Sequence, residues 1–392
     1  MVCHGSTIGL DAAVEEARRN TETLRTIELT VTQTNLFDPL TIRGTTFRNR
    51  LWVAPMCQYS ADDEDGVPTD WHLAHLGSFA SGGVGLIFTE ATAVTPAGRI
   101  SPQDLGLYND EQQQAFARIV RLIHAQGVSA GIQLAHAGRK ASTFKPWASE
   151  RGTVPADQGG WQTVAPSALA FEGYDVPHEL SVSEIDEIVE AFRASARRAI
   201  DAGFDVLELH AAHGYLLHQF LSPLSNSRSD EYGGSLENRA RLLLRIVTGV
   251  RAEVGDAVPL FVRLSGTDWV QAGGWDIEQT TTVAGWARDA GADFFDVSSG
   301  GNVSGVHIPL TPGYQVTFAT AVRDGAGVPT SAVGLITTAE QANGVVASGQ
   351  ADAVMMARQF LRDPHFALQA AHDLGVTLDY WPRQYERAAW RA

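Results

Sequence analysis

Residues 293–297 read Asp-Phe-Phe-Asp-Val and residues 354–357 read Val-Met-Met-Ala, and both runs are nearly continuously apolar. Strands of this composition are typically buried on both faces, as in the parallel sheets of α/β proteins. Outward from these two runs, similar β-rich runs recur along the chain. The eight predicted strands are Leu51–Ala54, Gly85–Thr89, Val128–Leu134, Asp205–His210, Pro259–Leu264, Asp293–Ser298, Thr330–Gly334 and Asp352–Ala357.

Amphipathic stretches with helical periodicity alternate with these strands. Ser181 and Glu184 have the spacing of a capping box, and Asp363-Pro364 places a cap before a proline at the first helical position. Glycine, which readily ends a helix, follows the expected helices at Gly127, Gly203, Gly255 and Gly291. The clearest predicted helices are Asp110–Gln126, Val182–Ala202, Leu236–Val254 and Ile277–Ala290.

Alternating strands and helices imply a parallel sheet with helices outside it. Eight such units favour closure into a single (β/α)8 TIM barrel over an open doubly wound sheet. No GxGxxG motif follows the first strand, which counts against a Rossmann domain. A barrel of this kind needs about 250 residues and tolerates insertions, so the 392 residues fit one decorated barrel.

Two segments depart from the alternation. Residues 1–35 mix charges and threonine without sustained periodicity. We expect them to be an N-terminal extension, either disordered or with a short helix over Ala12–Arg25, ahead of a barrel over residues 36–392. Residues 140–180, after the third strand, are rich in Gly, Pro, Trp and Ser. This long loop is predicted to form a flap over the C-terminal mouth of the barrel.

Composition narrows the function. The formal net charge of −16 disfavours nucleic acid as a partner, and no stretch is apolar enough to span a membrane. Charged residues occupy positions 15, 16, 18 and 19, where a secretory signal would need an apolar run. The two cysteines, Cys3 and Cys57, form no CxxC motif, so we expect a cytoplasmic protein without a thiolate-bound metal.

Active-site residues of barrels lie at the C-terminal ends of the strands and in the loops that follow. Here those positions are rich in hydrogen-bond donors and poor in carboxylates. They lack the paired acids of a retaining glycosidase and the strand-end lysine of a Schiff-base aldolase, and they suit an anionic, planar, phosphate-bearing ligand. The positions are Pro55, Met56, Cys57, Tyr59, Glu90, Ala91, Gln133, His136, Arg139, His210, His213, Tyr215, Arg263, Ser298, Ser299, Gly300, Gly301, Gly334 and Arg358.

The segment from His210 to Tyr215 reads His-Ala-Ala-His-Gly-Tyr and is the sharpest local motif. Three interpretations stay open on the residues alone. The histidines could be structural, each bonded to a backbone carbonyl. They could bind a metal with Glu208 or His218 as a third ligand. They could be neutral donors to a substrate oxygen, with Tyr215 as a proton source.

Longer motifs resemble one family. Besides the histidine motif, the segments APMCQYS at 54–60, IQLAHAGRK at 132–140 and NSRSDEYGGSLENR at 226–239 resemble the old yellow enzyme family, in particular its bacterial thermophilic-like branch. FTEATAVTPAGRI at 88–100, LFVRLS at 260–265, SSGG at 298–301, PGYQ at 312–315, AVGLIT at 332–337 and QYERAAW at 384–390 continue the resemblance. It runs from about Leu36 to Trp390.

The resemblance implies a noncovalently bound FMN over the barrel mouth. Gln133 would bind the pyrimidine edge of the flavin, and Arg263 would lie near N1 and O2, where reduced FMN carries negative charge. Backbone groups near Gly334, together with Arg358, would bind the phosphate. Cys57 would lie beside the flavin and tune its redox behaviour. Contacts to the ring system and the phosphate loop are also expected from Pro55, Met56, Ala91 and Ala357.

The resemblance also implies an activity. NADPH would reduce the flavin, and activated alkenes such as α,β-unsaturated carbonyls, maleimides and nitroalkenes would then be reduced in the same place. His210 and His213 would bind the substrate oxygen, Tyr215 would protonate the α-carbon, and Tyr59 would contact the substrate. Arg387 would reach into the active site of a neighbouring subunit, which implies a homodimer or a homotetramer.

The chain departs from the family pattern at three places, the first of which is the N-terminal extension over residues 1–35, unusual for this branch. Ala357-Arg358 stands where many relatives have Gly-Arg, and alanine does not readily adopt a positive φ, so the phosphate loop is expected to differ slightly. The 140–180 loop, with Trp147 and Trp161, is longer than in typical relatives, so substrate preference is not carried over.

Three rival functions differ in what they require. A dienoyl-CoA reductase-like enzyme would need an iron–sulfur cysteine cluster and further domains after the barrel, which two cysteines and a chain ending soon after the last strand disfavour. A metal-dependent hydrolase would use His210, His213 and Glu208. A non-catalytic barrel would bind flavin at most. The donors on the strand ends disfavour both of the latter.

Overall fold

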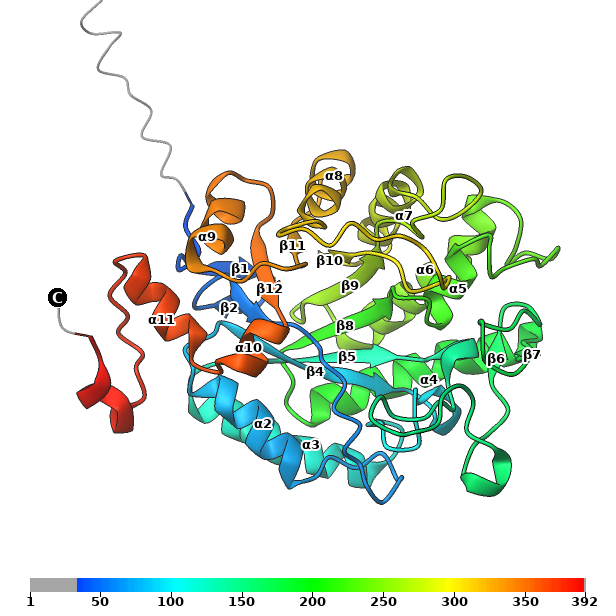
Figure 1. Ribbon diagram of the computed structural model, residues 1–392, viewed down its shortest axis with the longest axis horizontal. Coiled ribbons are helices and arrows are strands. Elements are labelled where there is room, and N and C mark those ends of the chain that lie inside the picture. The colour runs from blue at the N-terminus through cyan, green and yellow to red at the C-terminus, as the bar shows by residue number, and fades with distance from the viewer. Residues whose placement is uncertain (1–33, 391–392) are drawn as a thin grey trace, which may run out of the picture. The chain divides into compact units, whose positions relative to one another are not determined.

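In the computed structural model, which describes residues 34–390, eight parallel strands close into one barrel. Figure 1 shows the strands at the centre with helices around them. All eight strands lie where the apolar runs predicted them. In barrel order they are β3 (Leu51–Val53), β4 (Leu86–Ala93), β5 (Ser129–Ala135), β8 (Val206–Ala211), β9 (Leu260–Ser265), β10 (Phe294–Ser298), β11 (Thr330–Ala332) and β12 (Ala353–Met356).

Helices cover the outside of the barrel, and the four predicted ones are present within one residue of their expected ends. The helices are α2 (Asp70–Ala80), α3 (Asp110–Ala125), α4 (Val182–Asp201), α5 (Leu216–Leu221), α6 (Leu236–Val254), α7 (Ile277–Asp289), α8 (Val316–Ala326), α9 (Ala339–Ala347), α10 (Arg358–Arg362) and α11 (Phe366–Asp373).

The helix ends follow the predicted capping chemistry with one exception. Ser181 and Glu184 form the capping box of α4, and the four glycines that follow helices all have positive φ. The exception is the last helix, because α11 begins at Phe366 with His365 as its N-cap. The Asp363 carboxylate accepts a hydrogen bond from the His365 backbone N–H at 3.0 Å. Asp363 therefore shapes the turn before the helix instead of capping it.

The N-terminal end of the barrel is closed. A hairpin of β1 (Leu40–Ile42) and β2 (Thr45–Phe47), not predicted from the sequence, joins a buried cluster inside the barrel. Stacked and tilted rings fill this end, with Phe261 and Phe294 only 4.5 Å apart between centroids. This aromatic floor consists of Phe47, Trp52, Phe88, Phe261 and Phe294. It leaves the opposite, C-terminal end of the barrel for ligands.

The predicted flap of residues 140–180 lies at that end, where β4 and β5 finish (Figure 1). It contains a short helical turn over Ala156–Gln158 and the two-residue strands β6 (Val164–Ala165) and β7 (His178–Glu179). A cavity beneath it is walled by flap residues and by Tyr59 and Tyr215.

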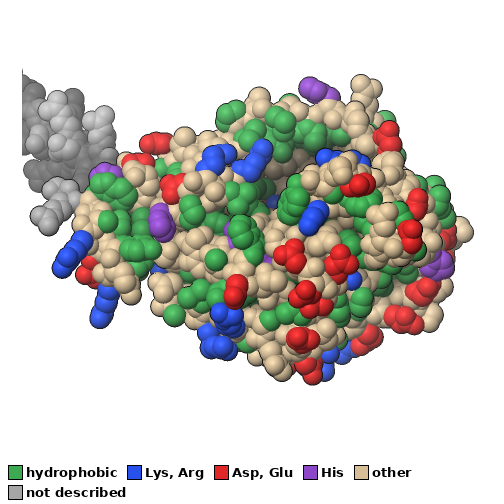
Figure 2. Space-filling view, turned by 60° about the horizontal axis from the view of Figure 1, so that its bottom comes forward, with side chains coloured by type: hydrophobic (Ala, Val, Ile, Leu, Met, Phe, Trp, Pro, Cys, Tyr) green, Lys and Arg blue, Asp and Glu red, His purple; other side chains and the backbone are tan. Residues whose placement is uncertain are grey.

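The helix considered for Ala12–Arg25, and almost all of the extension, lie outside the described residues. Within residues 34–390, no helix is both long and apolar enough to cross a membrane. On the face shown in Figure 2, many Asp and Glu side chains are spread over the surface and the basic side chains stand in small groups, in keeping with the negative net charge.

Candidate active site

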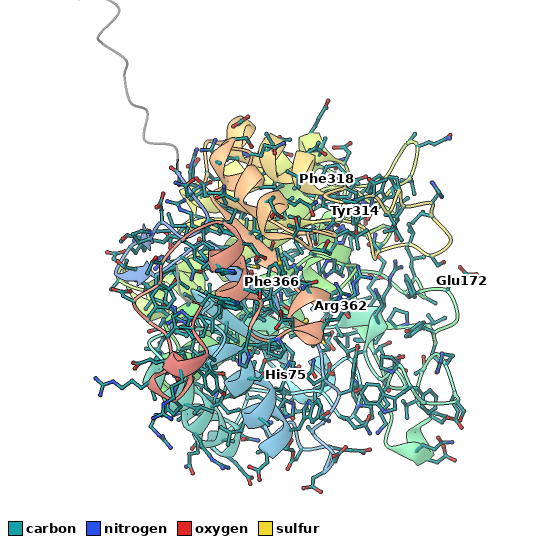
Figure 3. All side chains as sticks on the ribbon, turned by 60° about the vertical axis from the view of Figure 1, so that its left-hand side comes forward. His75, Glu172, Tyr314, Phe318, Arg362 and Phe366 are labelled. Atoms are coloured by element: carbon teal, nitrogen blue, oxygen red, sulfur yellow. The ribbon has the colours of Figure 1, made fainter. Side chains whose placement is uncertain are left out.

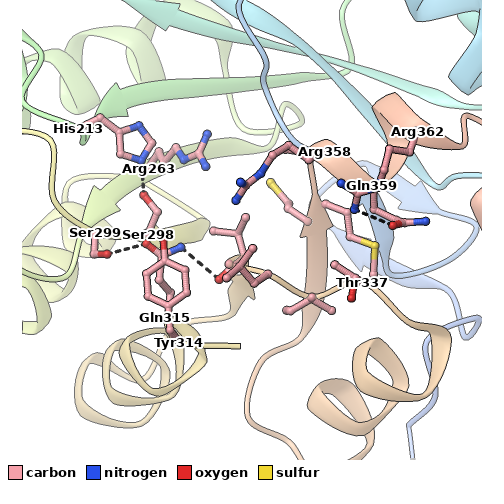
Figure 4. Close-up of a pocket in the computed structure, with 17 residues that line it drawn as sticks. His213, Arg263, Ser298, Ser299, Tyr314, Gln315, Thr337, Arg358, Gln359 and Arg362 are labelled. Carbon is pink, nitrogen blue, oxygen red and sulfur yellow. Dashed lines mark hydrogen bonds between the residues drawn. The ribbon is translucent and has the colours of Figure 1, made fainter. Parts of the chain in front are cut away.

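One cavity opens between the ends of β9, β10, β11 and β12 and the segments that follow them. In Figure 4, the guanidinium groups of Arg263 and Arg358 approach the same space from different walls. Ser299 donates a hydrogen bond to the Gln315 side chain at 2.6 Å, and Gln315 donates to the Val333 carbonyl at 3.3 Å. These bonds fix a wall of polar groups around the cavity.

Glycine is required in this wall. Gly334 has a φ of +118°, and a Cβ added there would lie 2.8 Å from the Gln315 amide nitrogen. A side chain at this position would therefore have a strained backbone and would crowd the Gln315 amide. Ala357 has a φ of −112°, so the alanine that replaces the family glycine needs no left-handed backbone. The difference expected at this position therefore involves no strain in φ.

Two arginines of α10 line the same cavity. Arg358 and Arg362 lie one helical turn apart, and Arg362 donates to the Gln359 side chain at 2.9 Å. Figure 3 shows Tyr314 and Arg362 on different elements of the barrel, with Glu172 out on the flap. A helix that brings two guanidinium groups to a polar cavity suits an anionic group such as a phosphate.

Gln133 on β5 and Arg263 on β9 are buried side chains of two strands that flank β8. Gln133 donates its amide N–H to Glu208 at 2.6 Å. Arg263 forms an ion pair with Asp296 at 2.7 Å. Both residues were predicted to contact a flavin, but these acidic partners were not predicted. The partners were not predicted because strand register, which the sequence does not reveal, brings them together.

The two histidines of the motif are neighbours. The rings of His210 and His213 lie 5.1 Å apart between centroids and meet edge to face. Burial is the largest cause that lowers the pKa of both imidazoles well below the usual value, and the positive charge of Arg263 lowers it further. Both rings are therefore neutral at neutral pH, as the donor interpretation of the motif requires.

Backbone and side-chain contacts hold the two imidazoles. The Ala212 N–H donates to Nδ1 of His210 at 3.4 Å. Nε2 of His213 lies 2.5 Å from Oγ of Ser298. His213 has a φ of +58°, an uncommon conformation for a residue other than glycine. The Ser265 hydroxyl accepts the His213 N–H at 3.0 Å and helps to hold this backbone.

Tyr215 lies beside His210, with 5.1 Å between ring centroids. It lines a second cavity of about 420 Å³ together with Tyr59 and Lys140, a volume in the range of small-molecule sites. Burial raises the pKa of both tyrosine hydroxyls well above the ordinary value. Tyr215 therefore keeps its proton across the physiological pH range.

Lys140, the last residue of the IQLAHAGRK segment, was not predicted to have a role at the site. Its ammonium donates to the carbonyls of His213 at 2.9 Å and Gly301 at 2.8 Å, and it lies 5.0 Å from the centre of the Tyr215 ring. Burial, with a contribution from Arg139, lowers the pKa of Lys140 to about 8. Lys140 thus ties the loop after β8 to the loop after β10.

The remaining predicted residues divide into two groups. Pro55, Met56 and Cys57 follow the end of β3 as expected, whereas Ala91, which was expected after the second strand, lies within β4 because that strand extends to Ala93. Cys57 packs in one cluster with Ala91, Tyr59 and Tyr215, and burial raises the pKa of its thiol well above the usual value. The thiol is therefore protonated. Arg387 is exposed in a short helical segment, Arg383–Ala388, near the C-terminus and lines neither cavity.

The structure does not favour the metal interpretation of the histidine motif. Within residues 34–390, no group of three or more His, Cys, Asp or Glu side chains is arranged to hold a metal ion. Glu208 is engaged with Gln133. His218 pairs with buried Asp268 at 3.3 Å and accepts the Gly214 N–H at 2.9 Å. Neither candidate third ligand therefore joins the two histidines.

Residues without a predicted role complete both cavities. Tyr314 and Gln315 belong to the PGYQ segment, which contributed only to the family resemblance. Arg362 could have been found from its spacing of four residues from Arg358, because this spacing places both on one helix face. Thr143, Phe144 and Tyr174 come from the flap, where the sequence carries no periodic signal.

Fold and site together define a class: a TIM barrel with an arginine-lined cavity at its mouth, next to a pair of neutral imidazoles and a protonated tyrosine. Residues 35–376 match the profile of the NADH:flavin oxidoreductase / NADH oxidase family. The chain belongs to this family, the old yellow enzyme family. It is therefore a flavin-dependent oxidoreductase.

Similarity to individual relatives supports the same family assignment. The chain is 47% identical to the NADPH dehydrogenase of Listeria monocytogenes serotype 4b, over 91% of this chain and 99% of that protein. The structure of an old yellow enzyme homologue from Zymomonas mobilis superimposes with a TM-score of 0.72 at 29% identity, covering 91% of this chain and 98% of that one. A 2-naphthoyl-CoA reductase complex gives a TM-score of 0.79 at 27% identity, but the 87% of this chain that matches spans only 52% of that protein.

Proposed function

We propose that this protein is an NADPH-dependent ene-reductase that holds FMN noncovalently and reduces activated carbon–carbon double bonds. The observation that carries the proposal is the pair of neutral imidazoles with Tyr215 beside them, at the mouth of a barrel whose adjoining cavity is lined by arginines. The name of the Listeria relative, NADPH dehydrogenase, supports NADPH as the reductant.

The residues of the first cavity fit FMN. Arg358 and Arg362 would hold the phosphate, and the backbone at Gly334 permits close approach of the ribityl chain. Arg263 and Gln133 offer a positive charge and an amide to the polar edge of the flavin ring. Bound FMN would supply the hydride chemistry that links oxidation of NADPH to reduction of the alkene.

Hydrogen bonds set which nitrogen of each histidine donates. Nδ1 of His210 accepts the Ala212 N–H, so its proton resides on Nε2. If the Ser298 hydroxyl donates to Nε2 of His213, the proton of that ring resides on Nδ1. Two N–H groups then remain for the carbonyl or nitro oxygen of a substrate. They stabilise the negative charge that develops there as the double bond is reduced.

Tyr215 supplies the proton for the α-carbon. Its hydroxyl stays protonated because burial raises its pKa, and it lines the cavity under the flap. A neutral phenol next to a developing enolate is a suitable general acid, since the enolate is a stronger base than the substrate oxygen was. Tyr59 closes the same cavity, and its ring packs edge to face on Trp147 of the flap at 5.8 Å.

The wide cavity suits enones, enals, maleimides and nitroalkenes without selecting one of them. We also propose that the protein is a cytoplasmic homodimer or homotetramer in which Arg387 reaches a neighbouring subunit's active site. The support is the exposure of Arg387 and its distance in the chain from the residues that line either cavity.

The test is the rate of NADPH oxidation without oxygen, with and without cyclohexenone. The proposal expects oxidation that depends on the enone and is slowed by about a hundredfold or more in His210→Ala, because one oxyanion donor is removed. His124→Ala, a surface histidine on α3 whose side chain contacts Asp205, is the matched control. NADPH oxidation that does not respond to any activated alkene would refute the proposal.

A further inference from the structure

A belt of polar side chains crosses the inside of the barrel between the aromatic floor and the mouth. It occupies neighbouring strands in the order Gln133 (β5), Glu208 (β8), Arg263 (β9), Asp296 (β10) and Ser331 (β11). Gln133 lies opposite Glu208, and Asp296 lies opposite both Arg263 and Ser331. Between β8 and β9 the belt is offset by two residues, because Glu208 lies opposite Phe261 of the floor and Arg263 lies opposite His210.

Hydrogen bonds and one ion pair join the belt. Gln133 donates to Oε1 of Glu208 at 2.6 Å, and Ser331 donates to Oδ1 of Asp296 at 3.0 Å. The guanidinium of Arg263 pairs with Asp296 at 2.7 Å. Oε2 of Glu208 is buried and has no hydrogen-bond partner within the described part of the chain. Nε of Arg263 and Oδ2 of Asp296 also have no hydrogen-bond partner there, but these two atoms form the ion pair with each other.

The charges of the belt do not balance if both acids are ionised. Glu208 and Asp296 are both 0% exposed, and the single cation Arg263 is paired with Asp296. Burial and the negative charge of Asp296 raise the pKa of Glu208 to about 8, against the opposing effects of Arg263 and Gln133. His210, two residues further along β8, is neutral. The belt is therefore balanced when Glu208 keeps its proton.

We propose that Glu208 is a protonated positioning residue, which orients the Gln133 amide toward the flavin and binds its proton more tightly once the flavin is reduced. This inference rests on the proposed function, because it requires bound FMN. One N–H of the Gln133 amide donates to Glu208, and this bond fixes the rotation of the amide. Its remaining N–H and its carbonyl oxygen therefore keep one orientation. Asp296 orients Arg263 in the same manner.

Ionisation of Glu208 and reduction of the flavin oppose each other. Negative charge added to the flavin makes ionisation of Glu208 less favourable, so the pKa of Glu208 rises on reduction. By linkage, ionising Glu208 makes reduction of the flavin less favourable. The midpoint potential therefore falls more steeply with pH in the window that begins at the Glu208 pKa of the oxidised enzyme. In that window, about one additional proton is taken up per electron pair.

The experiment measures the midpoint potential of the full-length, FMN-loaded protein from about pH 6 to about pH 10, a range that brackets the raised pKa. Glu208→Gln keeps the shape of the side chain and an oxygen that accepts from Gln133. We expect the steeper window in the wild type and its absence in Glu208→Gln. Glu253→Gln is the control, because this carboxyl lies on α6, outside the barrel, and accepts a hydrogen bond from Arg197 at 2.6 Å. This variant should keep the steeper window.

A third variant tests the positioning role. Glu208→Leu removes the acceptor for Gln133 and should raise the dissociation constant for FMN by about tenfold, whereas Glu208→Gln should stay near the wild-type value. A steep window that persists in Glu208→Gln, or that disappears in Glu253→Gln, would overturn the protonation role. Equal FMN affinity of Glu208→Leu and wild type would overturn the positioning role. Failure of the wild type to bind FMN would instead refute the proposed function itself.

Discussion

Nε2 of His213 lies 2.5 Å from Oγ of Ser298, and this contact joins the loop after β8 to the end of β10. If the hydroxyl donates in this contact, the proton of the imidazole resides on Nδ1. The barrel closure that brings these two strand ends together then also sets the tautomer of His213.

Ser298→Ala should slow reoxidation of the reduced enzyme by enones by about tenfold, because His213 loses the bond that fixes its tautomer. The measurement is a stopped-flow record of flavin colour after mixing reduced enzyme with cyclohexenone. Ser299→Ala is the comparison, since the Ser299 hydroxyl bonds to Gln315 and not to a histidine. A Ser298→Ala enzyme that reoxidises at the wild-type rate would contradict the tautomer assignment.

Tyr215→Phe should slow the same step by about a hundredfold or more and leave reduction by NADPH nearly unchanged, because the proton is needed only when the alkene is reduced. Tyr174→Phe is a suitable control. Tyr174 lines the same cavity, but its hydroxyl accepts a hydrogen bond from Thr143 at 3.2 Å. Equal losses in the two variants would point to a change of cavity shape and against proton donation.

Arg358→Gln should weaken FMN binding by roughly tenfold to a hundredfold, the loss expected for a hydrogen bond to a charged group. Riboflavin, which lacks the phosphate, should bind the variant and the wild type equally. Fluorescence titration of the apoprotein with both flavins measures the two affinities. Arg383→Gln, at an exposed position near the C-terminus, controls for loss of surface charge. If riboflavin binding weakens as much as FMN binding, Arg358 does not hold the phosphate.

Stability should depend on pH through Asp104. Burial raises the pKa of this carboxyl from 3.8 to about 7. Between these values the folded state keeps a proton that the unfolded state has lost, so the free energy of unfolding falls as pH rises. Above about pH 7 the full cost of ionising the buried carboxyl is present in the folded state.

Asp104→Asn removes this ionisation cost. The cost is on the order of 4 kcal/mol, because each unit of pKa shift corresponds to about 1.4 kcal/mol. Urea unfolding at about pH 5 and about pH 8 tests this, and the variant should gain stability relative to wild type at the higher pH. The amide keeps an oxygen that can accept the Ile100 N–H, which bonds to Asp104 at 2.8 Å. If the difference in stability between variant and wild type is the same at both pH values, Asp104 does not ionise in the folded protein.

Mixed oligomers test Arg387. An Arg387→Ala subunit has an intact Tyr215, and a Tyr215→Phe subunit has an intact Arg387. If Arg387 completes a neighbour's site, mixing the two inactive variants restores one working site per mixed pair of subunits, and activity recovers. If Arg387 acts within its own chain or not at all, the mixture is no more active than the separate variants. The mass of the assembly, from light scattering, is measured alongside.

Much of the fold followed from local patterns. Apolar runs and helical periodicity predicted the eight strands and the main helices, since a strand buried on both faces has to be apolar throughout. The hairpin of β1 and β2 was missed because each strand has only three residues. The start of α11 was placed too early because the Asp363 side chain serves a turn.

The candidate site was predictable as a set of positions but not as a set of contacts. Strand ends converge in a barrel, so His210, Arg263 and Arg358 could be grouped from the sequence. The partners Asp296, Ser298 and Glu208 depend on register between strands far apart in the chain. The contacts of Lys140 depend on loops that carry no periodic signal.

The most direct test of the central claim, electron transfer through a bound flavin to an activated alkene, is a visible absorption spectrum of the purified protein, followed without oxygen in a single cuvette. The account predicts a yellow protein that bleaches when NADPH is added and regains its colour when cyclohexenone follows. A colourless protein that takes up no FMN, or a bleached protein that stays bleached with every activated alkene, would contradict it.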